Sequence, residues 1–294
     1  MTWVRKGYLH NFSLNSHAQC PTVLVLDDRL RVFYADRAAG KAFIAYVDVD
    51  RAEPSRVIAW RYMPIAGLGK PGTFDDSGMM PSCIVDHGDV LYLYYSGWNQ
   101  GVTVPYRNSI GLLVSHDRGE TWMRWSDGPI MDRSVEDPYM AVTPWVTVDR
   151  DGKYWQMHYV SGTGWGDEGP SYIIKSAWSP DGIQWRRNAA QAVPSAFDGE
   201  AFSRPTLLGT RMWFCSRGTT DYRDGANAYR IRSAKFRDDI GWERTDEGLD
   251  VSPDGWDSTM TCYPCVVQVD GRTLLFSNGN GFGKTGIGYA EWKA

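Results

Sequence analysis

Polar side chains gather in five short segments that each precede a regularly spaced proline. The prolines are Pro21, Pro81, Pro144, Pro205 and Pro264, at intervals of 60, 63, 61 and 59 residues. Carboxylates that share one pocket raise one another's pKa, which lets an acid and a base coexist near neutral pH. The segments therefore predict acid–base chemistry if the fold brings them to one place. Their polar residues are His17, Gln19, Asp75, Asp76, Glu136, Asp137, Glu200, Arg204, Asp257 and Thr259.

Position relative to the proline selects the catalytic candidates. Asp76 and Glu200 each lie five residues before their proline, so we expect both to be catalytic. His17 and Asp257 are further catalytic candidates, and an imidazole with a pKa near 6.5 suits general acid–base work. The acidic candidates also have a structural alternative, because Asp and Gly at the start of a strand often only form a turn. The same offset gives the uneven ring Ser16, Asp76, Tyr139, Glu200 and Thr259.

A second set of side chains is expected to bind substrate, several of them on loops around the pocket mouth. Aromatic rings offer flat apolar faces to sugars, and Arg, Lys and Asn hydrogen-bond hydroxyl or anionic groups. For Trp98 and Trp165 the structural alternative is strong, because tryptophan is also buried between sheets. The substrate-binding set is Gln19, Asp75, Tyr95, Trp98, Asp137, Tyr139, Trp165, Arg204, Arg217, Thr259, Asn280 and Lys284.

A repeat of about 60 residues must position these side chains. A tryptophan series shares the period, and Asp/Gly turns between β-branched and aromatic stretches predict short hairpins. Four-stranded repeats of this kind are the blades of a β-propeller. We therefore predict an all-β, five-bladed β-propeller that forms a single domain over residues 1–294. The tryptophans are Trp3, Trp60, Trp122, Trp185 and Trp242.

The phase of the repeat predicts how the ring closes. The chain ends in IGYAEWKA, which corresponds to a third strand, and the missing fourth strand is found at Thr2–Arg5. We expect this N-terminal strand to complete the last blade. Closure of that kind removes the exposed strand edges of an open array.

Composition excludes several classes of function. The 294 residues carry a formal net charge of -4, which gives no basic patch for nucleic acid, and no apolar run is long enough to cross a membrane. The N-terminus lacks an apolar signal region, so we predict a cytoplasmic protein. Five cysteines are best explained as buried free thiols, and we expect no metal and no cofactor, although Cys262 and Cys265 form a C-x-x-C. Nothing in the sequence indicates an oligomeric state.

Several stretches resemble a known superfamily. FDDSGMMPSCIV, SRPTLL, YRIRSAKFRDD and NGNGFGKTGIGYA are similar to the five-bladed propeller glycosidases, which include glycoside hydrolase families 43, 32 and 130. The likeness is greatest to uncharacterised, signal-less propellers of bacterial surface-polysaccharide loci. SHDRGETW, residues 115–122, also resembles the Asp box of sialidase-like propellers, which implies a structural turn on the outside of a blade.

The resemblance to family 43 implies three catalytic carboxylates from different blades. By position, Asp76 and Glu200 would be two of them, with Asp257 or Asp137 as the third. That family also places an Asp at the start of the first blade, where this chain has SHAQ. The missing acid puts ordinary inverting hydrolysis in doubt.

The resemblance to family 130 implies a different mechanism. It needs one acid and a phosphate nucleophile held by basic residues, for which Arg204, Arg217 and Lys284 are candidates. We therefore favour an enzyme that acts on a glycosidic, nucleotide-linked or phosphate-linked sugar, with Glu200 as acid and Asp76 or His17 as base. A non-catalytic sugar-binding propeller, whose carboxylates would all pair with arginines, and a sugar isomerase or cyclase remain alternatives.

Overall fold

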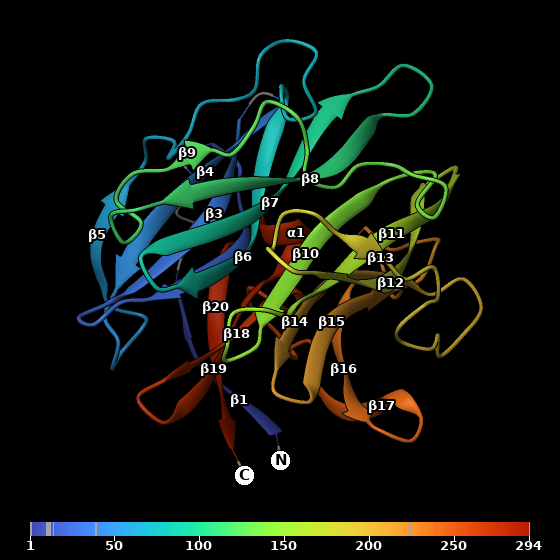
Figure 1. Cartoon of the computed structure of the whole chain (residues 1–294). Coiled ribbons are helices and arrows are strands. Elements are labelled where there is room, and N and C mark those ends of the chain that lie inside the picture. The colour runs from blue at the N-terminus through green and yellow to red at the C-terminus, as the bar shows by residue number, and fades with distance from the viewer. Residues whose placement is uncertain (1, 10–12, 14, 39, 224, 294) are drawn as a thin grey trace.

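The structure, a computed structural model, is nearly all β (Figure 1) and describes residues 2–9, 13, 15–38, 40–223 and 225–293. Met1 and residues 10–12 of the N-terminal stretch predicted to lack a signal lie outside this range, as does Leu14 in the segment before Pro21. In the described part, α1 (Asn280–Gly283) is a single short helical turn. None of the described helices has the length and apolar character needed to cross a membrane.

The described strands fall into five four-stranded units, each formed mainly by consecutive antiparallel strands. The first unit comprises β2 (His17–Val25), β3 (Leu30–Ala38), β4 (Lys41–Val49) and β5 (Val57–Arg61). The second comprises β6 (Gly78–His87), β7 (Val90–Gln100), β8 (Tyr106–Ser115) and β9 (Met123–Arg124). The third comprises β10 (Ala141–Val148), β11 (Trp155–Gly166), β12 (Gly169–Ser179) and β13 (Arg186–Arg187). The fourth comprises β14 (Ala201–Leu208), β15 (Arg211–Arg217), β16 (Arg230–Arg237) and β17 (Gly241–Leu249).

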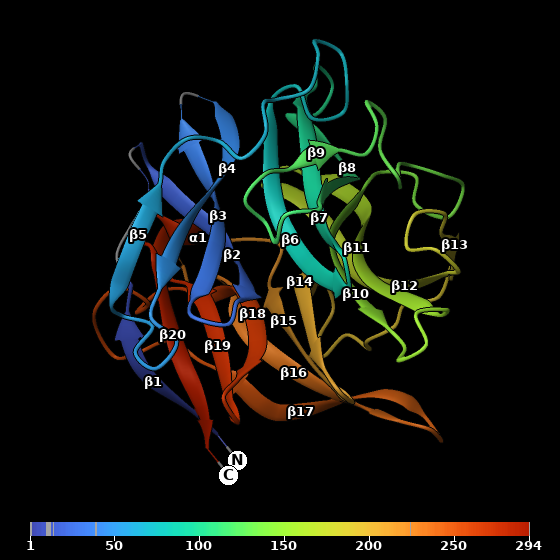
Figure 2. The ribbon, with the colours of Figure 1, turned by 60° about the vertical axis from the view of Figure 1, so that its left-hand side comes forward.

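The fifth unit combines the two ends of the chain. It contains β18 (Cys262–Val269), β19 (Arg272–Asn278) and β20 (Ile287–Lys293), and its fourth strand is β1 (Thr2–Tyr8). β1 runs antiparallel to β20, from the pair Thr2–Lys293 to the pair Tyr8–Gly288 (Figure 2). A single bridge, Ala42–Gly78, joins the first and second units into one eight-stranded sheet.

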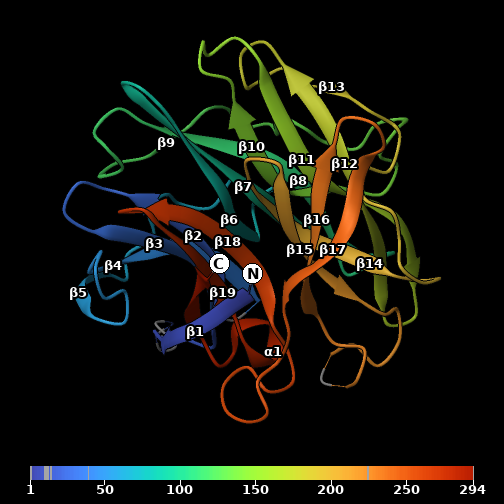
Figure 3. The same cartoon turned by 90° about the horizontal axis from the view of Figure 1, so that it is seen from below.

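The five units are arranged around a centre (Figure 3), with their first strands innermost. These strands contact one another in the order β2, β6, β10, β14, β18 and back to β2. An apolar cluster fills each space between neighbouring units. Between the first and second units, for example, Phe33 packs with Leu93 and Trp122. Between the fifth and first units, Phe276 packs with Val32.

The five regularly spaced prolines mark irregularities in the innermost strands. The register shifts at this point in every one of them, between Gln19 and Thr22 in β2 and between Ser203 and Thr206 in β14, for example. Proline has no N–H to donate to a ladder, so it is tolerated at such bulges. In four units the residue before the proline has a positive φ: these residues are Cys20, Thr143, Arg204 and Tyr263.

Candidate functional site

Most of the predicted site residues lie at one end of the molecule, which we call the axial end. There the innermost strands begin and the second strands of the units finish. Asp76 precedes β6 and Glu200 precedes β14, whereas Trp98, Trp165 and Arg217 lie in the last residues of β7, β11 and β15. The topology therefore brings segments that are far apart in sequence to the same end of the molecule.

Four of the predicted carboxylates are buried, and each binds an arginine of its own unit. The arginine lies on the fourth strand, two residues after the tryptophan of the repeat, so each pair ties the loop before the innermost strand to the outermost strand. We call these the loop–strand ion pairs. They are Asp75–Arg124 (2.6 Å), Asp137–Arg187 (2.7 Å), Glu200–Arg244 (3.0 Å) and Asp257–Arg5 (2.7 Å).

Hydroxyl groups and one lysine donate further hydrogen bonds to these carboxylates. Asp137 also accepts hydrogen bonds from Tyr159 Oη at 2.9 Å and from Lys175 Nζ at 3.1 Å. Burial alone would raise the pKa of Asp137, but these donors outweigh burial and hold the pKa below its ordinary value. A carboxyl with a lowered pKa stays ionised and is a poor general acid near neutral pH. Ser216 donates to Glu200 in the same manner.

Tyr95 serves as a partner of one of these carboxylates and does not lie on a loop. It belongs to β7, is fully buried, and its hydroxyl donates to Asp75 Oδ2 at 2.8 Å. Strand β7 continues to Gln100, so Trp98 is also a strand residue, and its indole lies against Gly78. The strand is longer than the sequence pattern predicted because its pairing with β8 extends to Tyr106.

The first unit lacks both members of a loop–strand ion pair. Its tryptophan is followed by Arg61 and Tyr62, so no arginine stands two positions after Trp60, and no acid lies just before β2. The acid and the arginine are thus absent together. The Trp-x-Arg spacing of the other four units was visible in the sequence, and it was the signal that could have assigned these carboxylates to structural pairs.

Asp76 differs from the other predicted carboxylates because no arginine binds it in the described structure. It is partly exposed, and it accepts hydrogen bonds from Gly72 N at 2.8 Å and from Ser77 Oγ at 2.9 Å. It lines a shallow cavity of about 360 Å³ between the first and second units, together with Lys41 and Gln100. Asp76 and Glu200 therefore lie in different environments.

Arg204 crosses the centre of the molecule. It is fully buried, and its guanidinium donates to the carbonyl oxygens of Pro21 and Pro81 and to Thr22 Oγ1. Its backbone N–H donates to Thr143 Oγ1 at 3.2 Å. The side chain predicted to bind ligand thus links the innermost strands of four units. The five cysteines are buried free thiols, and burial raises the pKa of Cys20, near Arg204, to about 11.

Arg217 lies in a box of tyrosine rings. It is 4% exposed, and its guanidinium carbon lies 3.7 Å from the ring centre of Tyr222 and 5.5 and 5.8 Å from those of Tyr229 and Tyr172. It donates to the carbonyls of Gly218 and Pro170, but its Nε has no hydrogen-bond partner. Burial would lower the pKa of Arg217, and the tyrosines, Tyr229 foremost, outweigh burial and raise it.

Neither Arg204 nor Arg217 has a carboxylate within ion-pair distance among the described residues. The other buried cations do, since Arg31 binds Asp48 at 2.8 Å and Lys175 binds Asp137. Buried charges are ordinarily paired, because taking a lone charge out of water is costly. The centre of the molecule and the axial end therefore each hold a buried positive charge, Arg204 and Arg217, without a counter-charge from the described part of the chain.

Aromatic rings extend outward from Arg217. Tyr106 lies edge-to-face with Trp165 at 5.1 Å, and its hydroxyl is 3.4 Å from that of Tyr172. On the other side, Tyr229 lies edge-to-face with Phe282 of α1 at 6.0 Å. Sequence reasoning found Trp165 and Arg217 but missed the four tyrosines. Three of them share no repeat position, because one lies in β12 and two lie in the loop between β15 and β16. The tyrosines are Tyr106, Tyr172, Tyr222 and Tyr229.

The remaining predicted residues surround the turn at α1. Gln19 Nε2 donates to Phe282 O at 2.6 Å, and Asn280 Oδ1 accepts from the N–H of Thr259 at 2.8 Å. His17 is half-buried, and burial, followed by the charges of Arg37 and Lys284, lowers its pKa. The lowered pKa favours the neutral form of the imidazole. Tyr139, 41% exposed, and the exposed Lys284 complete the predicted set. No cluster of three or more metal-ligating side chains occurs among the residues that the structure describes.

Comparison with solved structures identifies the class of fold. A structure described as a glycoside hydrolase matches with a TM-score of 0.73 and 18% identity, covering 99% of this chain and 93% of that one. A thermostable family-43 glycoside hydrolase matches with a TM-score of 0.67 and 14% identity, covering 97% and 91%. The Bombyx mori GH32 β-fructofuranosidase BmSUC1 matches with a TM-score of 0.65 and 14% identity, covering 94% and 61%. The fold is that of the propeller glycoside hydrolases of the family 43 and family 32 type.

Sequence comparison identifies closer relatives. No protein-family model matches the chain. Two Mycobacterium tuberculosis proteins, "Uncharacterized protein Rv1502" of strain H37Rv and "Uncharacterized protein MT1551" of strain CDC 1551, are each 37% identical over 287 residues. Each match covers 94% of this chain and 92% of the relative. The chain belongs to the same family as these two mycobacterial proteins.

Proposed function

We propose that this chain is a carbohydrate-binding β-propeller that recognises a sugar bearing an anionic group, such as a sugar phosphate or a nucleotide sugar, at the axial end. The observation that carries the proposal is the buried guanidinium of Arg217, which has aromatic neighbours but no described carboxylate. A phosphate or carboxylate on a ligand would supply the missing counter-charge, and Trp165 and the tyrosines would offer ring faces to the sugar.

The proposal treats the five units as the blades of one closed propeller and residues 1–294 as one domain. Two features support this: the innermost strands contact one another in cyclic order, and β1 is paired with β20. Nucleotide sugars and sugar phosphates are cytoplasmic metabolites, so the ligand class agrees with the predicted location.

The loop–strand ion pairs argue against glycoside cleavage by a pair of carboxylates. That mechanism needs an acid with a raised pKa and a second carboxylate on the other side of the scissile bond. Glu200 accepts hydrogen bonds from Arg244 and Ser216, and Asp257 binds Arg5. Both are buried structural partners, so we propose that neither takes part in proton transfer.

Access to Arg217 requires a local movement. The ring of Tyr222 covers the guanidinium, and its hydroxyl is held by the carbonyl of Glu168. Tyr222 lies in the loop between β15 and β16, outside any strand. We propose that an anionic ligand displaces this ring and pairs with Arg217. Tyr222→Ala should then raise the affinity for an anionic sugar, because the competing contact is removed.

Isothermal titration calorimetry with glucose, glucose 1-phosphate and UDP-glucose tests the proposal. The phosphorylated compounds are expected to bind at least about tenfold more tightly than glucose, a difference of ~1.4 kcal/mol. Equal affinities, or binding that Tyr222→Ala abolishes, would overturn it. Incubation of each complex followed by product analysis detects turnover in the same experiment.

A second candidate is an enzyme that transforms such a sugar, of the hydrolase, phosphorylase or isomerase type. Asp76 favours it, because this predicted catalytic carboxylate has no described arginine partner and lines a cavity beside Lys41. His17 favours it as well, because a neutral imidazole is able to accept a proton. Turnover that Asp76→Asn or His17→Gln abolishes would establish this candidate, and no turnover of glucose, glucose 1-phosphate or UDP-glucose by the wild type would count against it.

A further inference from the structure

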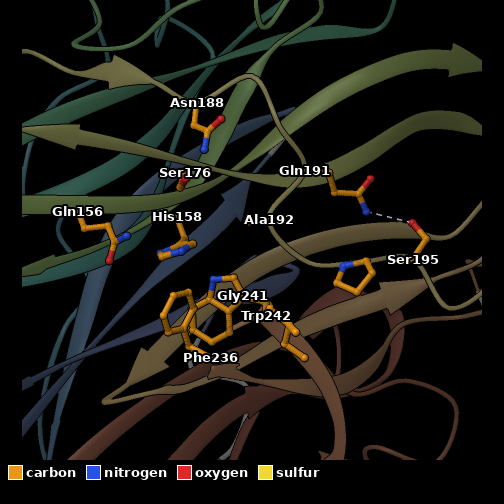
Figure 4. Close-up of a pocket in the computed structure, with 12 residues that line it drawn as sticks. Gln156, His158, Ser176, Asn188, Gln191, Ala192, Ser195, Phe236, Gly241 and Trp242 are labelled. Atoms are coloured by element: carbon orange, nitrogen blue, oxygen red, sulfur yellow. Dashed lines mark hydrogen bonds between the residues drawn. The ribbon is translucent and has the colours of Figure 1, made fainter. Parts of the chain in front are cut away.

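We propose that a cavity between the third and fourth units is a second carbohydrate site, and that it takes a neutral sugar. The cavity has a volume of about 730 Å³, which is in the size range of small-molecule sites. One wall is formed by β11 and β12, the other by β16 and β17, and the segment 188–195 closes one side (Figure 4). We call it the lateral cavity. It is separate from the residues that carry the proposed function and stands independently of them.

An aromatic platform forms one wall of the lateral cavity. Phe236 and Trp242 lie edge-to-face with ring centres 5.4 Å apart, and Phe236 is 40% exposed (Figure 4). Rings of this kind stack against the C–H faces of pyranoses. Trp242 belongs to the tryptophan repeat and is partly buried, as Trp185 is, whereas Trp3 and Trp122 are core residues and Trp60 is 54% exposed. The ring of Trp242 thus borders the lateral cavity and is not enclosed in the core.

Neutral hydrogen-bonding groups line the rest of the cavity. Amide and hydroxyl groups both donate and accept, as the hydroxyl groups of a sugar do. Gln191 is held in place, because its Nε2 donates to Val193 O at 2.6 Å and to Ser195 Oγ at 3.1 Å. Figure 4 shows these groups around the space in front of the rings. The polar lining residues are Gln156, His158, Ser176, Asn188, Gln191 and Ser195.

His158 is the most unusual lining residue. It is 2% exposed and lies edge-to-face with Trp242 at 5.4 Å, but its Nδ1 has no hydrogen-bond partner within the described structure. A buried polar atom without a hydrogen-bond partner destabilises the fold, because no protein contact replaces the hydrogen bonds that it made to water. A sugar hydroxyl in the cavity would supply that hydrogen bond.

Charge decides the class of ligand. None of the described residues that line the lateral cavity is an Asp, Glu, Lys or Arg. A phosphate or carboxylate would find no counter-charge in this lining, so the site favours an uncharged sugar. The axial end has the opposite character, with Arg217 buried and unpaired. We therefore expect the lateral cavity to bind neutral sugars and the axial end to bind anionic sugars.

Fluorine NMR of the full chain labelled with 5-fluorotryptophan tests the inference. The Trp242 signal is assigned by its loss in Trp242→Phe. The probes are the methyl glycosides of glucose, galactose, mannose and N-acetylglucosamine, with cellobiose and maltose, each at millimolar concentration. At least one probe is expected to shift the Trp242 signal and to leave the signal of Trp178, an exposed ring outside the cavity, unchanged.

Variants separate binding from folding. Trp242→Leu and Gln156→Leu should each weaken the responding probe about tenfold, and Trp178→Leu should have no effect. Asn188→Ala changes an exposed lining residue, so it keeps the test valid if Trp242→Leu does not fold. No shift with any probe, or equal shifts at Trp178, would overturn the proposal. Arg217→Gln should leave this binding unchanged, so loss of anionic-sugar binding at the axial end and loss of neutral-sugar binding here are distinguishable.

Discussion

The arginines of this chain occur in two settings, and the difference between them separates structure from function. In the loop–strand ion pairs, partly exposed arginines on the outermost strands bind fully buried acids. Arg204 at the centre and Arg217 at the axial end are themselves buried, and they contact carbonyls and tyrosine rings. The acids of the axial end thus serve the architecture of the units, and the positive charge there is left without a described partner.

The largest effect should come from breaking the most elaborate ion pair. Asp137→Ala leaves Lys175 and Arg187 without their shared acid, and loss of one partner of a buried pair costs about 3–5 kcal/mol. Urea denaturation should show this fall in the free energy of unfolding. The neighbouring exposed Glu136 is the matched control, and Glu136→Ala should leave stability nearly unchanged. Equal stabilities of the two variants would contradict a structural role for Asp137.

The pH dependence of stability should reveal the burial of His158 in the wall of the lateral cavity. Burial lowers the pKa of His158 to about 4, compared with 6.5 in the unfolded chain. The contribution of this group is complete above pH 6.5 and is lost as the pH falls to about 4, because only the unfolded state then gains the proton. The linkage amounts to about 3 kcal/mol. Denaturation at pH 7 and pH 4 should show a smaller loss for His158→Phe than for the wild type, and equal losses would contradict this assignment.

A double-mutant cycle measures one ion pair directly. Asp75→Asn, Arg124→Met and the double variant should give a coupling energy of about 1.5–3 kcal/mol, the range for hydrogen bonds to buried charged groups. If the two substitutions are additive in their effect on unfolding, the pair does not join the loop before β6 to β9.

The smallest effect is expected from an ion pair on the surface. Arg118 binds Asp86 at 2.8 Å, but both side chains are about half exposed. Exposed pairs contribute roughly 0–1 kcal/mol because water and salt screen them. Arg118→Ala should therefore shift the urea midpoint far less than Asp137→Ala, and a comparable shift would show that exposure does not govern these pairs.

The periodic features of the fold could be predicted from the sequence. Pro81 and Pro205 mark innermost strands, each of which has a register shift at its proline, and the Trp3 stretch indicated a strand that pairs with the C-terminal one. The environment of Glu200 could not be predicted from its offset alone. The side chain of Glu200 points toward Arg244, which is 44 residues away in sequence. The pairing of β16 with β17 brings this arginine near.

The lateral cavity and the tyrosine box were beyond sequence reasoning for a related reason. Trp242 has the same repeat position as Trp122, and its partial exposure depends on how the segment 188–195 packs. Tyr222 lies in an irregular loop, where no periodicity indicates which way a side chain points. Repeats determine strand positions, whereas non-repeating segments determine what is exposed at each site.

The affinity of glucose 1-phosphate for wild type, Arg217→Lys and Arg217→Gln tests the central claim most directly. If the buried positive charge recognises the anion, Arg217→Gln should weaken binding by at least about tenfold, and Arg217→Lys should weaken it less. Binding of neutral probes at Trp242 serves as the control for folding. Unchanged affinity in Arg217→Gln, with the control intact, would contradict the account.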